Sequence, residues 1–273
     1  SGLEVAPLKV YIDDIEYTDG GSISSKEVFD KMRAGATVRT AQVTTEEFFN
    51  IFEKYAKKGD SLIYIGFSTG LSGTFNAANI AKNDILEKYP EFDITIIDTK
   101  CASMGFGMVV YKALVMLKKG ALKEEIINAA VFNSEHMEHI FTVDNLEYLY
   151  RGGRVSRTTA FVGGLLGIKP VLDVNDEGKL IPVTKVKGRQ NAIKKMVELA
   201  LERGYKLDKQ LIGISHGDDF AAVDTIKDIM KEMAGCENFL VSYVGCAVGA
   251  HSGPGTLAVF FLDSNSPYES FEG

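Results

Sequence analysis

The chain has 273 residues, of which 45% are hydrophobic, and a formal net charge of −7. This length is near the size at which single cores stop growing, so we favour two domains over one. The negative charge argues against a nucleic-acid-binding face, which needs clustered Lys and Arg. The sequence has no apolar run of membrane-spanning length and no basic-then-apolar leader, so we expect a cytoplasmic protein. The three cysteines lack metal-ligand spacing, and we predict no metal site.

The first half of the chain alternates short apolar runs with amphipathic helical patterns, as a parallel α/β sheet requires. Ser24 or Ser25, and Thr44 or Thr45, precede glutamates near the capping-box position and indicate two helix starts. In chain order, the sequence predicts a strand over 5–12, helices over 24–32 and 44–55, strands over 62–65 and 94–97, helices over 104–118 and 124–136, and a strand over 139–143. We expect the helix over 104–118 to be largely buried, and the strand over 139–143 to be the last of this half.

The pattern changes after Asn145. The segment 146–157 is helix-like but is interrupted by Gly152-Gly153. A hairpin with strands over 168–174 and 180–186 follows, then a helix over 190–203, a strand over 211–215, a helix over 221–233, and strands over 239–243 and 256–262. We therefore predict a parallel α/β domain over 1–150 and an α+β domain over 151–273, with a ligand site in the cleft between them.

A hydroxyl-rich turn from Ser68 to Thr74 lies between the strand over 62–65 and a helical pattern that starts at Phe75. The first amides of a helix lack internal partners and its dipole favours negative charge, so such a turn can hold a carboxylate or a phosphate. The segment Thr40-Ala41-Gln42 also precedes a helix start and could point toward the same place. Turns of this kind also occur as plain connections, which leaves both interpretations open.

Three other features could contact a ligand or a partner. His251 lies beside a Gly-Pro-Gly turn that opens onto an apolar strand, which would hold its imidazole in place, although a lone histidine is more often structural. The segments 151–157 and 185–189 are basic. Each suits contact with an anion or a partner protein, and the alternative for each is a solvated surface.

The sequence Gly66-Phe67-Ser68-Thr69-Gly70 also matches the nucleophile elbow of serine hydrolases. In this alternative Ser68 is the nucleophile of an esterase, the base is His216 or His251, and the acid is Asp173, Asp218 or Asp219. The second half of the chain does not resemble the continued parallel sheet of that fold, and the alternative leaves the Ser72-Gly73-Thr74 motif unexplained. A nucleotide enzyme is still less supported, because no Gly-Lys-Ser or Gly-Lys-Thr loop occurs.

Seven short motifs occur in order along nearly the whole chain. They are Val5-Ala6-Pro7-Leu8 with Tyr17-Thr18-Asp19-Gly20; Thr40-Ala41-Gln42; Ser68 to Thr74; Asp98-Thr99-Lys100 with Ala102-Ser103-Met104-Gly105; Gly152-Gly153-Arg154-Val155-Ser156; Ile168-Lys169-Pro170; and His251-Ser252-Gly253-Pro254-Gly255. Together they resemble the DegV family, whose characterised members bind long-chain fatty acids and include the fatty-acid-binding subunit of bacterial fatty acid kinase.

The resemblance implies that Thr40 and Ser72 hold the carboxylate of a fatty acid, with His251 nearby and the tail in an apolar tunnel between the domains. We expect Ser68, Thr69 and Gly73 to complete this site, and Arg154, Lys187 and Arg189 to dock a partner. That partner would be a separate ATP-dependent kinase subunit that phosphorylates the carboxylate. The chain itself would be a carrier without catalytic residues or a cofactor, loaded with an acid such as palmitate, stearate or oleate, and transient membrane contact is compatible with this role.

The sequence departs from the family pattern in two places. The family usually begins with a strand that ends in Asp-Ser-Thr, upstream of the match to Val5, and this sequence has no counterpart to it. We therefore expect the parallel sheet to lack an early strand and the head-group site to lack one wall. The pair Ser68-Thr69 stands where two serines are common, which keeps the hydroxyl and adds a methyl group.

Overall fold

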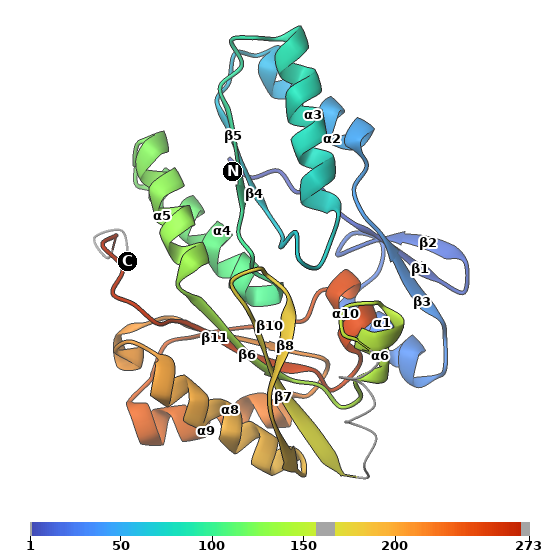
Figure 1. Cartoon of the computed structure of the whole chain (residues 1–273), viewed down its shortest axis with the longest axis vertical. Helices are drawn as coiled ribbons and strands as arrows, with labels where there is room; N and C mark the ends of the chain where they lie inside the picture. Colours follow the sequence, from blue (N-terminus) through green and yellow to red (C-terminus); the bar gives the residue numbers. More distant parts are fainter. Residues whose placement is uncertain (1, 157–166, 269–273) are drawn as a thin grey trace.

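The computed structural model describes residues 2–156 and 167–268. The molecule is elongated, with a six-stranded sheet toward one end and a two-stranded parallel sheet with its helices toward the other (Figure 1). A three-stranded antiparallel sheet lies at the side, close to α1 and α10 (Figure 1). This mixture of helices with parallel and antiparallel strands confirms the predicted α/β class.

The three-stranded sheet contains β1 (Lys9–Ile12), β2 (Ile15–Thr18) and β3 (Val38–Ala41), in the order β2-β1-β3. Both neighbours pair antiparallel with β1, so these strands do not join the parallel sheet that the sequence predicted. The predicted strand over 5–12 is confirmed only in its second half, as β1. The strand starts at Lys9, and Asp13 and Asp14 adopt positive φ angles of 47° and 69° that turn the chain back into β2.

The elements from α1 to α5 come next in the chain. They are α1 (Ser25–Arg33), α2 (Thr45–Ala56), β4 (Leu62–Gly66), α3 (Thr74–Lys88), β5 (Ile94–Asp98), α4 (Ser103–Lys118) and α5 (Lys123–Glu135). Capping boxes at Ser24 and Thr44 start α1 and α2, which confirms the two predicted helix starts. Strands β4 and β5 are parallel, and within the described residues the other edge of β4 pairs with no strand. Leu62 and Tyr64 pack toward α2 and α3, whereas Ile63 and Ile65 pack toward α4 and α5.

The remaining elements build the large sheet. They are β6 (Met137–Thr142), α6 (Glu147–Arg151), β7 (Ile168–Val174), β8 (Leu180–Lys187), α8 (Arg189–Arg203), a 3-10 turn (Leu207–Lys209), β9 (Ile212–His216), α9 (Phe220–Ala234), β10 (Phe239–Tyr243), α10 (Cys246–Ser252) and β11 (Leu257–Leu262). The strand order is β10-β9-β11-β6-β7-β8. Helices α8 and α9 cover one face, where Ile140, Ile214 and Val259 are fully buried. The other face, with Phe141 and Phe260, turns toward α4.

The position of β6 corrects one prediction. The strand over 139–143 was predicted to be the last of the N-terminal half, but β6 pairs with β11 and β7 inside the large sheet. Its residue Phe141 lies opposite Ala258 on one side and Leu172 on the other. Hydrophobic periodicity shows that a segment is a strand but not which strand it pairs with. The division near residue 150 stays a prediction.

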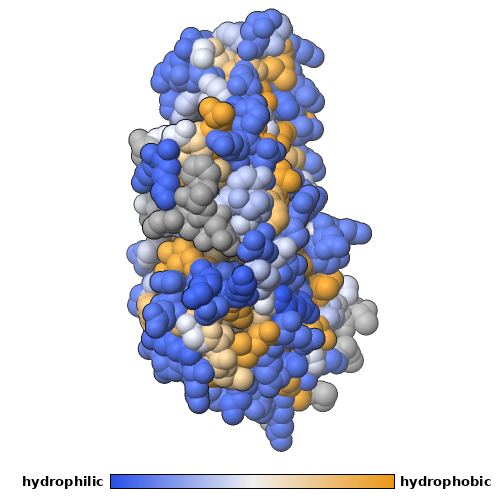
Figure 2. Space-filling view, turned by 90° about the vertical axis from the view of Figure 1, so that its left-hand side faces the viewer, coloured by the Kyte–Doolittle hydropathy of each residue, from blue (hydrophilic) through white to orange (hydrophobic). Residues whose placement is uncertain are grey.

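The surface on the side of α5 is mostly hydrophilic, with hydrophobic residues gathered in patches (Figure 2). Two exposed apolar side chains lie at the connection between α4 and α5. Leu117 is 46% exposed and Leu122 is 70% exposed. Among the helices of the described ranges, none is long and apolar enough to cross a membrane.

Candidate functional site

A cavity of about 1350 Å³ lies between the N-terminal elements and the large sheet. Residues of β4, α4, the large sheet and α10 line it. The apolar part of this wall includes Ile63, Ile65, Phe106, Val110, Leu114, Phe141, Leu180, Ala258 and Phe260. Helix α4 is therefore less buried than predicted, because Val109 and Met116 pack in the core, whereas Phe106, Val110 and Leu114 face the cavity. A large apolar cleft with few polar groups is typical of a small-molecule site.

Four of the predicted ligand residues line this cavity: Thr40, Ser72, Gly73 and His251. The hydroxyl of Thr40, on β3, lies 2.7 Å from Nε2 of His251, at the end of α10. The hydroxyl of Ser72 lies 2.9 Å from that of Thr74 and accepts a hydrogen bond from the Thr74 amide. Three segments that are far apart in the sequence thus bring short polar side chains to the wall of one apolar cavity.

The imidazole of His251 is neutral at physiological pH. Burial, followed by the positive charge of Arg154, lowers the pKa of His251 from 6.5 to about 4. A neutral imidazole has one donor and one acceptor nitrogen, so it can donate one hydrogen bond to a carboxylate. Gly152 makes room for the ring, because a Cβ atom at that position would collide with Nδ1 of His251.

Arg154 also lines the cavity, whereas its sequence context predicted a place on a partner-docking surface. It is half-buried, and its guanidinium donates hydrogen bonds to the carbonyl of Leu71, at 3.1 Å, and to the carbonyl of Gly152. Within the described part of the chain no carboxylate forms an ion pair with it. Burial lowers the pKa of Arg154, which reflects the cost of a cation with little solvation. A bound anion would offset that cost, because charge-assisted hydrogen bonds are strong.

The other two predicted docking residues lie on or near the surface at the end of β8. Lys187 is exposed. Arg189 is only 20% exposed and forms ion pairs with Asp219, at 2.8 Å, and Asp144, at 3.6 Å. The docking role of these residues stays a prediction.

Ser68 and Thr69 do not line the cavity. Ser68 is fully buried, and its hydroxyl donates to the carbonyl of Gly178 at 2.8 Å and accepts from the amide of Gly70 at 3.1 Å. The Thr69 hydroxyl donates to Asp98 at 2.5 Å and accepts from Lys100 at 2.9 Å. The first half of the turn therefore holds the fold together, and only the second half, from Leu71 to Thr74, faces the cavity.

This geometry also argues against the hydrolase alternative. The hydroxyl of Ser68 contacts a carbonyl and an amide, not an imidazole. His251 is bonded to Thr40, and Nδ1 of His216 accepts the amide of Asp219 at 3.2 Å. The three candidate acids form ion pairs with arginines, namely Asp173 with Arg203, Asp218 with Arg33, and Asp219 with Arg189. Among the described residues, no hydrogen bond joins the side chains of a candidate nucleophile, base and acid to one another, because each side chain is bonded to other groups.

Two further residues of this region belong to motifs seen in the sequence but were not predicted as site residues. Thr74 bonds Ser72, and Asp19, which also lines the cavity, accepts hydrogen bonds from the first amides of α10. Asp19 was visible only as part of the motif Tyr17-Thr18-Asp19-Gly20. Among the residues whose placement is described, no three His, Cys, Asp or Glu side chains are grouped so that they could hold a metal ion.

Comparison with known proteins assigns the family. The model of the DegV family, described as a family of uncharacterised proteins, matches residues 1–264. A DegV domain-containing protein of Clostridium perfringens is 41% identical over 259 residues, which cover 94% of this chain and 89% of that protein. The structure resembles a fatty-acid-binding DegV family protein of Thermus thermophilus, with a TM-score of 0.80, 28% identity, and coverage of 93% of this chain and 89% of the other.

A further solved structure shares the fold at lower identity. It is the fatty acid kinase (Fak) B3 protein of Streptococcus pneumoniae loaded with linoleic acid, with a TM-score of 0.83, 22% identity, and coverage of 94% of this chain and 90% of the other. The fold is thus shared across most of the length of each chain. Since the family model also spans nearly the whole sequence, the chain belongs to the DegV family.

Proposed function

We propose that this chain binds a long-chain fatty acid, with its carboxylate at Thr40, Ser72, His251 and Arg154 and its tail along the apolar wall of the cavity. The observation that carries the proposal is that one cavity has a polar end and apolar walls. The polar end has hydroxyls, a neutral imidazole and a cation that has no carboxylate partner among the described residues, and the walls are aliphatic and aromatic side chains. The fatty-acid-binding relative from Thermus thermophilus supports it.

Tail burial would dominate the affinity. A C16 or C18 acid such as palmitate, stearate or oleate has roughly fifteen methylenes, which contribute on the order of 10 kcal/mol before association and ordering costs. A single hydrogen bond to the carboxylate contributes about 1.5–3 kcal/mol. The polar residues therefore orient the carboxylate and select an acid over other lipids, while the tail provides most of the binding free energy.

A bound carboxylate would then be the phosphoryl acceptor for a separate ATP-dependent kinase subunit. This part of the proposal rests on the family resemblance, and it makes the chain a carrier with no catalytic residue of its own. Lys187, exposed at the end of β8, and the neighbouring Arg189 are the proposed docking residues. We further propose a cytoplasmic location, with transient membrane contact through the exposed Leu117 and Leu122 for loading.

Extraction and melting experiments test the proposal directly. Organic extraction of the purified protein should release a saturated or monounsaturated fatty acid, and adding palmitate to stripped protein should raise its melting temperature. If extraction yields no acid and palmitate leaves the melting temperature unchanged, the proposed function is wrong.

A comparison of acid and alcohol ligands tests the site residues. Thr40→Ala, Ser72→Ala and His251→Ala should each weaken palmitate binding about tenfold and hexadecanol binding much less, since the lost contact is to a charged group. Thr225→Ala is the matched control, because its hydroxyl bonds the Ala221 carbonyl on α9 and the residue does not line the cavity. Equal losses for acid and alcohol would show that the three residues support the fold and do not recognise the carboxylate.

A further inference from the structure

Helix α10, which carries His251, is held at both ends by the three-stranded sheet. At its first turn, the carboxylate of Asp19 accepts the amides of Cys246, at 2.9 Å, and Ala247, at 3.0 Å, one with each oxygen. At its last turn, Nε2 of His251 lies 2.7 Å from the Thr40 hydroxyl. Asp19 directly follows β2 and Thr40 lies on β3, and both strands pair with β1. One small sheet therefore fixes the two ends of α10.

Helix α10 needs this support because its own sequence provides little. It has seven residues, and helices of that length are marginal without tertiary contacts. The residue that precedes it, Gly245, has no side chain to cap the first amides. Asp19 pairs two of these amides, and its negative charge also interacts favourably with the N-terminal end of the helix dipole.

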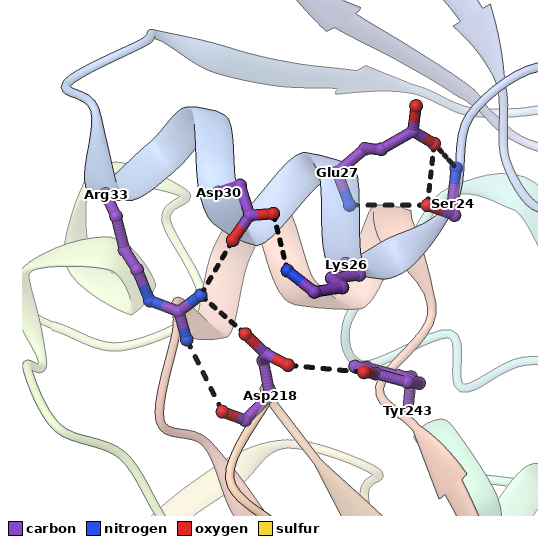
Figure 3. A network of polar contacts seen from close by, with 7 residues as sticks. All are labelled: Ser24, Lys26, Glu27, Asp30, Arg33, Asp218 and Tyr243. Atoms are coloured by element: carbon purple, nitrogen blue, oxygen red, sulfur yellow. Dashed lines mark hydrogen bonds and ion pairs between the residues drawn. The ribbon is translucent and has the colours of Figure 1, made fainter.

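The elements that surround α10 are held in place by contacts that do not involve Asp19. Helix α1 packs closely on α10, since a Cβ atom at Gly249 would lie 2.8 Å from the ring of Phe29. At the end of α1, Arg33 bonds Asp218 at 2.7 Å, and Asp218 also accepts the hydroxyl of Tyr243 on β10 at 3.2 Å (Figure 3). This network ties α1 to the large sheet. Removing the Asp19 carboxylate should therefore release the first turn of α10 and not the elements around it.

We propose that Asp19 is a positioning residue for carboxylate recognition: by fixing the first turn of α10, it keeps His251 in hydrogen-bonding distance of Thr40. The inference rests on the proposed function, because it gives Asp19 a role in selecting acids. Asp19 acts through α10 and need not touch the ligand.

The test compares Asp19→Ala and Asp19→Asn with Asp13→Asn. Asp13 lies in the turn between β1 and β2 of the same sheet, and its carboxylate also accepts a backbone amide, that of Thr37 at 3.1 Å, but it has no hydrogen bond to α10. Asp19→Ala should weaken palmitate binding about tenfold and hexadecanol binding less than twofold, the size of one hydrogen bond to a charged group. Asp19→Asn keeps one acceptor oxygen and should fall between Asp19→Ala and the wild type, and Asp13→Asn should leave the ratio of the two affinities unchanged.

A double variant separates positioning from general destabilisation. If Asp19 acts through His251, adding Asp19→Ala to His251→Ala should cause no further selective loss of palmitate binding. Additive selective losses, or equal losses for acid and alcohol in Asp19→Ala, would overturn the inference.

Measurements without ligand keep this inference separate from the proposed function. In the ligand-free protein, the Asp19 variants should speed hydrogen exchange at the amides of Cys246 and Ala247 and shift the imidazole ¹⁵N signals of His251, while Asp13→Asn should change neither. Unchanged exchange and unchanged imidazole signals would refute the positioning role even if the wild type binds palmitate. If the wild type binds no acid, the proposed function fails, and these signals still decide whether Asp19 positions His251.

Discussion

Replacing Ser68 by alanine distinguishes a structural serine from a nucleophile. The Ser68 hydroxyl donates to the Gly178 carbonyl across 110 positions of sequence and accepts the amide of Gly70, and the side chain is fully buried. Alanine would leave both backbone groups without these partners. A buried polar group left unpaired costs about 1–3 kcal/mol, so we expect Ser68→Ala to lower the free energy of unfolding by about 2–4 kcal/mol.

Equilibrium urea unfolding measures the loss, and hydrogen exchange at the Gly70 amide shows whether it is local. The control is Ser134→Ala. The hydroxyl of Ser134 also donates to a carbonyl, that of Ala130 at 2.6 Å, but inside α5, where alanine is a good helix former, so its effect should stay within about 0.5 kcal/mol. Ser68 is not a structural serine if Ser68→Ala costs no more stability than the control, or if the wild type hydrolyses p-nitrophenyl esters in a Ser68-dependent way.

Three further predictions concern the cavity and α10. Since burial and Arg154 lower the pKa of His251 from 6.5 to about 4, the unfolded chain binds the proton more readily, and stability should fall as the pH drops through this range. In urea unfolding, His251→Gln should reduce this acid-induced loss of stability by up to about 3 kcal/mol, and an unchanged pH dependence would contradict the lowered pKa of His251. Arg154→Gln should weaken palmitate binding about tenfold or more and hexadecanol binding less, whereas Lys187→Gln should affect neither; the idea fails if the two variants behave alike. Gly249→Ala should lower stability by about 1–3 kcal/mol, because its Cβ would lie 2.8 Å from the buried ring of Phe29, and an unchanged melting temperature would contradict the close packing.

Features that depend on interactions over a few residues could be predicted from the sequence. The capping boxes at Ser24 and Thr44 fixed the starts of α1 and α2, because a hydroxyl and a glutamate three positions later bond each other's backbone amides. Apolar runs located β4, β5 and most strands of the large sheet. The motif resemblance indicated the family, which the family model confirms, and it singled out Thr40, Ser72 and His251, which the structure places around one cavity.

Contacts between distant segments needed the tertiary structure. The pairing of β6 with β11 and β7 depends on strands that come later in the chain, so periodicity assigned it to the wrong half. Two hydroxyls of one turn have different roles, because the β7–β8 turn covers Ser68 with the carbonyl of Gly178 and leaves Ser72 facing the cavity. Arg154 looked like a surface residue because its sequence neighbours are polar and glycine-rich, but its guanidinium bonds the carbonyl of Leu71. The sequence by itself determined the local helices, strands and motif residues. Which side chains of the site are buried, and which face the cavity, was decided by contacts with residues that are distant in the sequence.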